Sequence, residues 1–211
     1  SISMEEMLEL SGQGAKVIQI RAVEFANKYK VLVRVLSSFE PGSGTLILQE
    51  EEGMEDAVIT GIASQTDQTK FTLHGVADTP GIASGILSPI SDEGIEVDVI
   101  VQNVSVSNKT DFTFTVATSD RTQVEAVLKE KMKGISYDEL IIDEGIGKVS
   151  LVGVGMRSHA GIASSAFNAL ADAEINIQMI STSEIKITIV IAENQLENAV
   201  RTLHKKFNLG D

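Results

Sequence analysis

The order of apolar and polar positions in this chain repeats itself after 80 residues. Residues 72–101 align without a gap with residues 152–181, and eight of these thirty positions are identical. The identities include the run Gly-Ile-Ala-Ser, which occurs at 81–84 and again at 161–164. A register kept over this length indicates a duplicated domain, so we expect two copies of one fold.

Each copy predicts a strand, a tight turn, a helix and a second strand. The glycine of each turn lets the backbone come close at the start of the helix. In copy two the apolar stripe of this helix has helical spacing: Ile162, Ala166 and Leu170. In copy one Pro89 predicts a kink or an early end, because proline cannot donate a hydrogen bond to the carbonyl of Gly85. The second strands are predicted at 95–101 and 175–179, where apolar and polar residues alternate.

Further strands and helices complete the pattern around each copy. After the repeat in copy one, the sequence predicts a strand at 112–116, a helix at about 120–133 and a strand at 137–143. Copy one therefore has the β-α-β-β-α-β order of a ferredoxin-like domain, whereas copy two ends after its second helix. An unassigned strand at 57–63, which the polar stretch SQTDQ separates from the strand near 70–77, would supply the missing strand.

The opening of the chain has no counterpart in the repeat. Its pattern predicts helices at 4–10 and 14–29 and strands at 31–36 and 45–48. We therefore predict an α+β fold, in which a short α/β segment precedes two ferredoxin-like βαββαβ domains in tandem, the first inserted into the second. The predicted ranges are 1–48 for the opening segment, 49–56 for an acidic solvated linker, 57–63 for the strand that completes the second domain, 64–145 for the first domain and 146–211 for the second.

Composition and charge narrow the possible functions. The 211 residues are 43% hydrophobic, which is enough for real cores. The chain has no cysteine, so it has neither disulfides nor a thiolate metal site, and we expect it in the reducing cytoplasm. No apolar run approaches the roughly 20 residues that span a bilayer, and SISMEEMLEL is not a secretory signal. The net charge of −13 opposes phosphate backbones and anionic membranes, so we expect neither nucleic acid nor a membrane as a partner.

The repeated turn offers a way to hold a small carboxylate. Free backbone N–H groups and the helix dipole attract anions at the start of a helix. The glycines could instead serve only the tight packing of strand against helix, and both alternatives stay open. Asp78 could pair with the ammonium group of a ligand or cap the helix, and the sequence alone favours the cap.

The sequence contains no recognisable catalytic constellation. His159 has no serine or cysteine nucleophile motif beside it, while His74 and His204 suit a strand and an exposed helix position. Neither copy has a P-loop lysine signature or a His, Asp and Glu cluster at metal-ligand spacing. We therefore expect no catalytic residue and no metal site, and a pair of domains that bind a small molecule.

Several segments of the sequence resemble the aspartate kinase family. They cover nearly the whole chain: MEDAVITGIA at 54–63, GVADTPGIA at 75–83, VDVIVQNV at 97–104, FTFTV at 112–116, KVSLVGVGMRSHAGIAS at 148–164, INIQMISTSEIKI at 175–187 and AVRTLHKKF at 199–207. The repeat resembles the ACT domain, and MEEMLELSGQGAKVIQIRAVEFANKY resembles the end of the family's kinase domain. The lysine- and glycine-rich nucleotide motif of that domain is absent here, so the chain resembles a regulatory region with the tail of a kinase domain.

This resemblance implies a function for the complete enzyme. It would transfer the γ-phosphoryl group of ATP to the β-carboxylate of aspartate, and its ACT domains would sense the end products lysine and threonine and inhibit the transfer. ATP and Mg²⁺ would belong to the complete kinase, and we expect no cofactor in this chain. The implied partners are threonine and lysine, further copies of the chain through the ACT domains, and the catalytic domain or subunit of the kinase.

The resemblance also implies two effector sites. The first is the turn of copy one, with Asp78, Gly81, Ile82, Ala83, Gln102 and Asn103, closed by Asn176 and Ile177 of copy two from another chain. The second is the equivalent turn of copy two, with Ser158, His159, Gly161, Ile162, Ala163, Ser181, Thr182 and Ser183. The second turn departs from the family pattern, because Ala160 stands where members often have proline and Ser158 replaces the acidic residue of copy one.

Two classes of function fit these observations. One is an allosteric amino-acid sensor of aspartate kinase, and the other is a structural dimerisation module whose turns hold no ligand. An RNA-binding ferredoxin-like domain fits poorly, because the middle strands lack paired aromatics and the charge has the wrong sign. A specific ligand raises the melting temperature by mass action, so adding threonine or lysine to the chain separates the first two.

Overall fold

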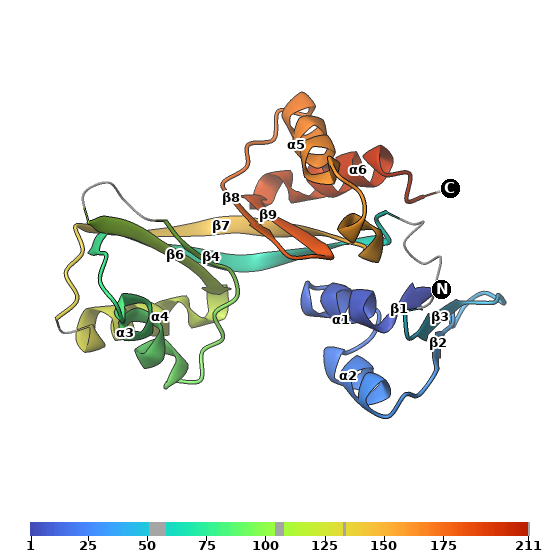
Figure 1. Ribbon diagram of the computed structural model, residues 1–211, viewed down its shortest axis with the longest axis horizontal. Coiled ribbons are helices and arrows are strands. Elements are labelled where there is room, and N and C mark those ends of the chain that lie inside the picture. Colours follow the sequence, from blue (N-terminus) through green and yellow to red (C-terminus); the bar gives the residue numbers. More distant parts are fainter. Residues whose placement is uncertain (51–57, 104–107, 133, 211) are drawn as a thin grey trace. The chain divides into compact units, whose positions relative to one another are not determined.

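The computed structural model describes residues 1–50, 58–103, 108–132 and 134–210 (Figure 1). The chain divides into two compact units: unit 1 is Ser1–Gln65 with Lys148–Asp211, and unit 2 is Thr66–Gly147. Most of the predicted acidic linker at 49–56 lies outside the described residues. The predicted domain boundaries stay a prediction.

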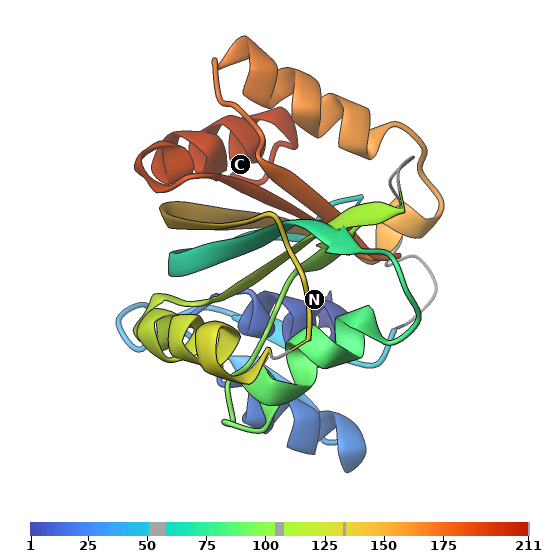
Figure 2. The ribbon, with the colours of Figure 1, turned by 90° about the vertical axis from the view of Figure 1, so that its left-hand side faces the viewer.

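Unit 2 contains copy one and has the strand order of a ferredoxin-like domain. Its sheet runs β5 (Ile100–Gln102), β6 (Lys109–Ala117), β4 (Gly61–Ala77) and β7 (Glu139–Val152). Two helices, α3 (Ile82–Ser91) and α4 (Arg121–Lys131), cover one face of this sheet, and a 3₁₀ turn, η2 (Thr118–Asp120), leads into α4 (Figure 1, Figure 2). Apolar side chains from the sheet and the helices form its core: Phe71, Leu73, Ile86, Ile90, Phe112, Phe114, Val124 and Leu128. Burying each of them fully stabilises the fold by about 1.5–3 kcal/mol.

Unit 1 contains copy two and repeats this plan. Its sheet runs β8 (Met179–Thr182), β9 (Lys186–Ala192), β7 and β4, so the two long strands β4 and β7 take part in both units. Two helices, α5 (Ile162–Asp172) and α6 (Leu196–Lys206), cover one face (Figure 1). The 3₁₀ turns η3 (Val154–Arg157) and η4 (Glu193–Gln195) precede them.

The fourth strand of unit 1 comes from the part of the chain that precedes copy one. The N–H of Thr60 donates to the carbonyl of Val152 at 2.8 Å, and Ile59 is buried in the core formed by β7, β9, α5 and α6. Gly153 allows this close approach, because a Cβ there would lie 2.3 Å from the carbonyl oxygen of Val58. The prediction of two ferredoxin-like domains, with the first inserted into the second, is therefore confirmed.

The opening segment belongs to unit 1. It consists of β1 (Ile2–Ser3), α1 (Met4–Gly12), α2 (Ile20–Lys28), β2 (Val33–Val35) and β3 (Thr45–Leu48), and β3 pairs with β1 in parallel and with β2 antiparallel. In Figure 1, α1 lies on the face of the unit 1 sheet opposite to α5 and α6. The core beneath it combines residues of the segment with two from the sheet: Ile2, Met4, Met7, Leu10, Val23, Ala26 and Ile47, with Ala63 and Val152.

The period-two alternation of β7 explains why both faces of this sheet are covered. Val149 and Leu151 belong to the core beneath α5 and α6. On the other face, Val152 packs with the opening segment, and Ser150 Oγ donates to Gln13 Oε1 at 3.0 Å. Buried hydroxyls require partners, and Ser150 Oγ has two, because Thr188 Oγ1 on β9 also lies 2.9 Å away.

The structure replaces two predicted pairs of strands by two continuous ones. The strands predicted at 57–63 and near 70–77 are parts of β4, and the polar stretch SQTDQ lies inside it. Likewise β7 joins the strand predicted at 137–143 to the first strand of copy two, and residues 144–147 lie inside it. β4 and β7 are hydrogen-bonded neighbours in the sheet, so both stretches are parts of strands. Each stretch contains a left-handed residue, Asp67 with φ 57° and Gly145 with φ 81°, so the strands are irregular there but not interrupted.

Three other elements differ in their bounds. Helix α3 continues through Pro89 to Ser91, because only the last turn loses a hydrogen bond. Helix α2 begins at Ile20 rather than 14, since the chain turns at Gly14, whose φ is 98°. The strand predicted at 95–101 is regular only in β5, because the N–H of Val99 bonds to the Thr115 hydroxyl instead of to a carbonyl. No helix among the described residues is long and apolar enough to cross a membrane.

Candidate functional site

The first turn begins with a bulge at the end of β4. The register between β4 and β6 shifts around Gly75, whose φ is 66°. The N–H of Gly75 donates to Asp111 Oδ1 at 3.1 Å, and His74 Nδ1 lies 3.0 Å from the same oxygen. The hydrogen bond from Gly75, followed by that from His74, holds the pKa of Asp111 below its usual value. Beyond the bulge, the N–H of Asp78 donates to the carbonyl of Asn108 at 2.9 Å, which fixes the backbone where the turn starts.

The start of α3 has open backbone amides. Gly81 is its N-cap and has a left-handed conformation, with φ 93°, that favours glycine. The N–H of Gly85 donates to the carbonyl of Gly81 at 2.9 Å. Because the first N–H groups of an α-helix have no partner within the helix, the amides of Ala83 and Ser84 are left at its open end. A Cβ at Gly81 would meet nothing within 4 Å, so the approach to these amides is open.

The Asp78 side chain does not cap this helix. The N-cap of α3 is Gly81, and no side chain bonds to the helix start, so the capping alternative is wrong. The half-buried Asp78 makes no side-chain hydrogen bond or ion pair with any described residue, although its backbone is fixed. A carboxylate without a partner in the described part of the chain thus lies three residues before the N-cap of a helix whose start attracts anions.

Gln102 and Asn103 lie at the same end of the sheet as this turn. Gln102 pairs with Phe112 of β6, and the Thr110 hydroxyl donates to the carbonyl of Asn103. On the other side of β6, Thr110 is the register partner of Val76, two residues before Asp78. The structure therefore brings Asp78, Gly81–Ala83, Gln102 and Asn103 to one end of one sheet, with the Gln102 and Asn103 side chains exposed.

The second turn has the same backbone but different side-chain bonds. Gly161 is the left-handed N-cap of α5, with φ 89°, and the N–H of Ser165 donates to its carbonyl at 2.9 Å. His159 Nδ1 donates to the carbonyl of Gly155 at 2.8 Å, and Ser158 Oγ lies 3.2 Å from the same ring nitrogen. Both polar side chains are thus bonded within the turn, and Ile162 is buried while Ala163 is half-buried.

The residues predicted opposite the second turn lie at the end of β8. Ser181 and Thr182 pair with β9, and the N–H of Ser183 donates to the carbonyl of Lys186 at 2.8 Å. The N–H of Gly153 donates to Ile185 at 3.0 Å, so the β8–β9 turn lies at the end of the sheet where the second turn begins. Asn176 and Ile177 lie between α5 and β8 in unit 1, with Asn176 exposed and Ile177 packed partly against the core. That they close the first site stays a prediction.

Two charged residues beside the second turn were missed by the sequence analysis. Arg157, the last residue of η3, forms ion pairs with Glu5 and Glu50, and the bond to Glu50 is the largest cause that raises its pKa. Glu6 is buried and completes a capping box with Ser3 at the start of α1. The spacing of Ser3 and Glu6 is the signal that could have identified this box.

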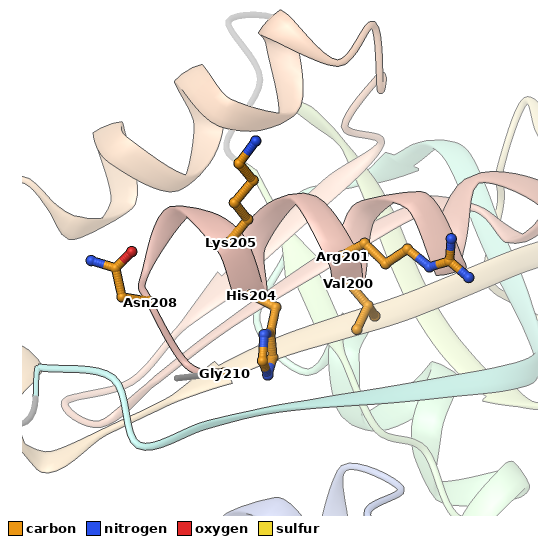
Figure 3. Close-up of a pocket in the computed structure, with 6 residues that line it drawn as sticks. All are labelled: Val200, Arg201, His204, Lys205, Asn208 and Gly210. Carbon is orange, nitrogen blue, oxygen red and sulfur yellow. The ribbon is translucent and has the colours of Figure 1, made fainter.

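A groove of about 480 Å³ lies along the C-terminal half of α6. It is lined by Val200, Arg201, His204, Lys205, Asn208 and Gly210. In Figure 3 Lys205 points away from His204 and Val200, and Arg201 and Asn208 point toward opposite ends of the helix. The basic side chains do not converge, so this groove offers no built site for a ligand. Their positions at the end of α6 suit the helix dipole, which favours cations there.

No group of three or more His, Cys, Asp or Glu side chains that could hold a metal ion occurs among the described residues. They therefore offer no set of ligands for the Mg²⁺ that the resemblance implies for the complete kinase.

Comparison with known proteins identifies both copies. The ACT domain model matches residues 72–133, and a second ACT domain model matches residues 149–207. A chain in a crystal structure of aspartokinase alpha and beta subunits is 47% identical to this chain, with a TM-score of 0.67. The match covers 72% of this chain and 99% of that chain. The chain belongs to the aspartokinase family.

Other members of the aspartokinase family give the extent of the match. The ligand-free regulatory subunit of aspartate kinase from Thermus thermophilus is 34% identical, with a TM-score of 0.66, and is 98% covered by 71% of this chain. Aspartate kinase of Pseudomonas fluorescens (strain SBW25) is 58% identical over 209 residues, which are 99% of this chain and 51% of that protein. The chain thus spans about half the length of the curated aspartate kinases it matches.

Proposed function

We propose that this aspartokinase region is an allosteric sensor, in which the first turn binds an end-product amino acid, threonine or lysine, and thereby inhibits phosphorylation of aspartate by the complete kinase. The kinase reaction itself would use ATP and Mg²⁺ bound outside the described part of this chain. Effector binding changes activity only if the effector has different affinities for the active and inactive states.

One observation carries this proposal: the Asp78 carboxylate, which has no partner among the described residues, belongs to the turn that leads into the open start of α3. A free amino acid is a zwitterion, so it needs an anion and an anion-binding group a few ångströms apart. The amides at the start of α3 suit the carboxylate of the ligand, and Asp78 suits its ammonium group. Gln102 and Asn103 lie at the same end of the sheet and offer polar groups for the ligand side chain.

A titration of the pure chain with L-threonine and with L-lysine tests this assignment. Asp78→Ala should weaken binding by about 1.5–3 kcal/mol, the usual scale for a hydrogen bond to a charged group. It should leave the melting temperature of the ligand-free chain nearly unchanged, because Asp78 caps nothing. Asp92→Ala, at the other end of the same helix, is the matched control and should bind normally. Normal binding by Asp78→Ala would contradict the assignment.

A second candidate function, self-association without a ligand, is favoured by the edge strands. β5 and β8 are the outer strands of the sheet, and they expose Ile100 (45%) and Ile180 (41%), which are equivalent residues of the two copies. Exposed edges with apolar side chains favour pairing with another strand. We propose that copies of the chain associate along these edges. Sedimentation should show an oligomer that Ile100→Lys weakens, and a strict monomer at micromolar concentration would contradict this.

The opening segment carries a further surface for a partner. Among the described residues, eight of the eleven exposed large apolar side chains lie between 17 and 39. Apolar side chains gathered in this way mark an interaction surface. We propose that the catalytic part of the kinase covers it, because the chain spans about half the length of its relatives. Phe25→Ser with Leu32→Ser should abolish association with the separately expressed catalytic part, while Ile180→Ser should leave that association intact.

A further inference from the structure

Arg157 connects the second turn with three other parts of unit 1. It is the last residue of η3, directly before Ser158. Its Nη1 donates to both carboxylate oxygens of Glu50, at 2.9 and 3.1 Å, and its Nη2 donates to Glu5 at 2.6 Å. Its Nε lies 3.6 Å from Glu184, in the β8–β9 turn beside Ser183. One guanidinium therefore contacts α1 through Glu5, the residues after β3 through Glu50, and the β8–β9 turn through Glu184.

Glu6 makes the corresponding connection at the other end of η3. It is 2% exposed, and its Oε1 accepts from the N–H of Val154 at 2.9 Å and from the hydroxyl of Thr60 at 2.5 Å. Its Oε2 accepts from the N–H of Ser3 at 2.9 Å. A buried carboxylate without these donors would be costly, so Glu6 holds η3, α1 and the residue before β4 in one arrangement.

These contacts leave η3 little freedom to move without α1. The 3₁₀ turn has four residues, and its first and last residues both bond to α1. The chain then passes directly into Ser158 and His159, and His159 bonds back to Gly155 within the same turn. If the second turn moves, η3 must therefore move with it, and the bonds of η3 to Glu5 and Glu6 transmit that movement to α1.

Copy one lacks this connection, although its helix start has the same backbone geometry. With the offset of 80, the residue equivalent to Arg157 is Ala77, which has no charge, and the residue equivalent to Val154 is His74. The first turn follows β4 with no counterpart of η3. The contacts of Arg157 and Glu6 are therefore not a requirement of the ACT fold, which copy one forms without them.

We propose that Arg157 and Glu6 form a clamp that couples the second turn to the opening segment, so that an amino acid bound at the second turn changes the stability of α1. This proposal rests on the proposed sensor function and extends it to the second turn, whereas the clamp itself can be tested without a ligand. Arg157 and Glu6 are positioning residues, since neither is placed in contact with a ligand. The clamp would be the path by which occupancy of copy two reaches the kinase tail.

Hydrogen exchange of the ligand-free chain tests the clamp. Arg157→Gln removes the charge but keeps a polar side chain of similar length. Amides of α1 and of the turn at 158–163 should both exchange roughly fivefold faster, the factor expected when exposed ion pairs are lost. The strands β6 and β9 should be unaffected. Arg201→Gln, which also removes an arginine paired with a glutamate in unit 1, is the matched control and should change neither region. Faster exchange in only one of the two regions would overturn the proposal.

A second experiment adds L-threonine or L-lysine at millimolar concentration. In the wild-type chain, protection should rise in the turn at 158–163 and also in α1. In Arg157→Gln the turn should still gain protection while α1 gains less than half as much. Protection confined to the turn in the wild type, or an equal gain in α1 of the variant, would overturn the coupling. If neither amino acid protects the second turn of the wild type, that turn is not a sensor for them, and the ligand-free experiment alone decides the clamp.

Discussion

The two copies share one backbone at the helix start and differ in what surrounds it. The N-cap glycines have φ values of 93° and 89°, and each accepts the first helical hydrogen bond at 2.9 Å. In copy one Asp78 is unpaired among the described residues, whereas in copy two Ser158 and His159 bond within their own turn. Backbone geometry was thus retained after duplication where glycine is required, and the polar side chains beside it changed.

The copies also differ in how the chain completes them. Copy one has four strands that follow one another in the sequence, whereas copy two takes its fourth strand from the residues before copy one. Copy two is covered by the opening segment on its second face, through the buried Glu6 and Ser150 contacts. This difference indicates that a perturbation in copy two reaches the opening segment more directly than one in copy one.

The largest expected effect separates the copies by their fourth strand. In Gly153→Ala the new Cβ would lie 2.3 Å from the carbonyl oxygen of Val58 and 2.8 Å from the Cα of Ile59, so the backbone must move. We expect a loss of stability of about 1–3 kcal/mol, as for an overpacked core. Hydrogen exchange should place the loss in unit 1, while amides of β5 and β6 in unit 2 stay protected.

The matched control for this substitution is Gly42→Ala. A Cβ there would meet nothing within 4 Å, so the melting temperature should stay within about 2 °C of the wild type, since surface substitutions rarely exceed about 0.5 kcal/mol. Equal losses of protection in units 1 and 2 would show that the two copies unfold together. In that case the separate origin of the fourth strand does not make copy two less stable than copy one.

The repeat in the sequence predicted much of this architecture. A gapless register of thirty positions predicted the duplication, and the missing strand of copy two predicted the insertion, because a ferredoxin-like sheet needs four strands. The predicted breaks in β4 and β7 were wrong for a physical reason. Polar residues such as Gln65–Gln68 resemble a turn when taken alone, but here they belong to a strand that lies between two hydrogen-bonded neighbours.

The candidate sites were predictable only in part. The turn glycines were found because the left-handed conformation restricts the residue type, and the structure confirms their geometry. Whether Asp78 caps the helix could not be decided, since an acidic residue before a helix suits both a cap and a ligand. Glu5 and Glu50, which both bond to Arg157, each lie more than a hundred positions before it in the sequence, and no local pattern encodes such pairs.

A smaller effect should follow from giving the second turn the carboxylate of the first. Ser158→Asp places an anion at the position equivalent to Asp78. If both turns bind zwitterions in the same way, the second turn should bind lysine or threonine roughly tenfold more tightly, as expected for about 1.5 kcal/mol from one charge-assisted hydrogen bond. Calorimetric titration in an Asp78→Ala background isolates the second turn.

The control for this substitution is Asn168→Asp, which adds the same charge on the exposed side of α5 beyond its first turn. It should leave affinity unchanged. Should Ser158→Asp also leave affinity unchanged, the chemistry of the two turns differs, and the shared backbone alone does not make a site.

The smallest expected effect is a pH dependence that belongs to copy one. Asp111 accepts hydrogen bonds from Gly75 and His74, and they lower its pKa in the folded chain from the ordinary value of 3.8. A carboxyl whose folded pKa is depressed stabilises the fold in full above its unfolded pKa, and this contribution disappears as the pH falls through the folded pKa. Because the Asp111 side chain is 52% exposed, we expect no more than about 0.5 kcal/mol. The pairing of β5 with β6 and of β8 with β9 makes Lys186 the equivalent residue of copy two, so unit 1 has no counterpart of this carboxylate. Exchange of β6 amides should therefore slow less in Asp111→Asn than in the wild type when the pH rises from about 3 to 5, after correction for the intrinsic rate.

The control is Asp172→Asn, which changes an exposed carboxylate of α5 and should behave like the wild type. If Asp111→Asn shows the same pH response as the wild type, the bulge at Gly75 is held without the charge of Asp111.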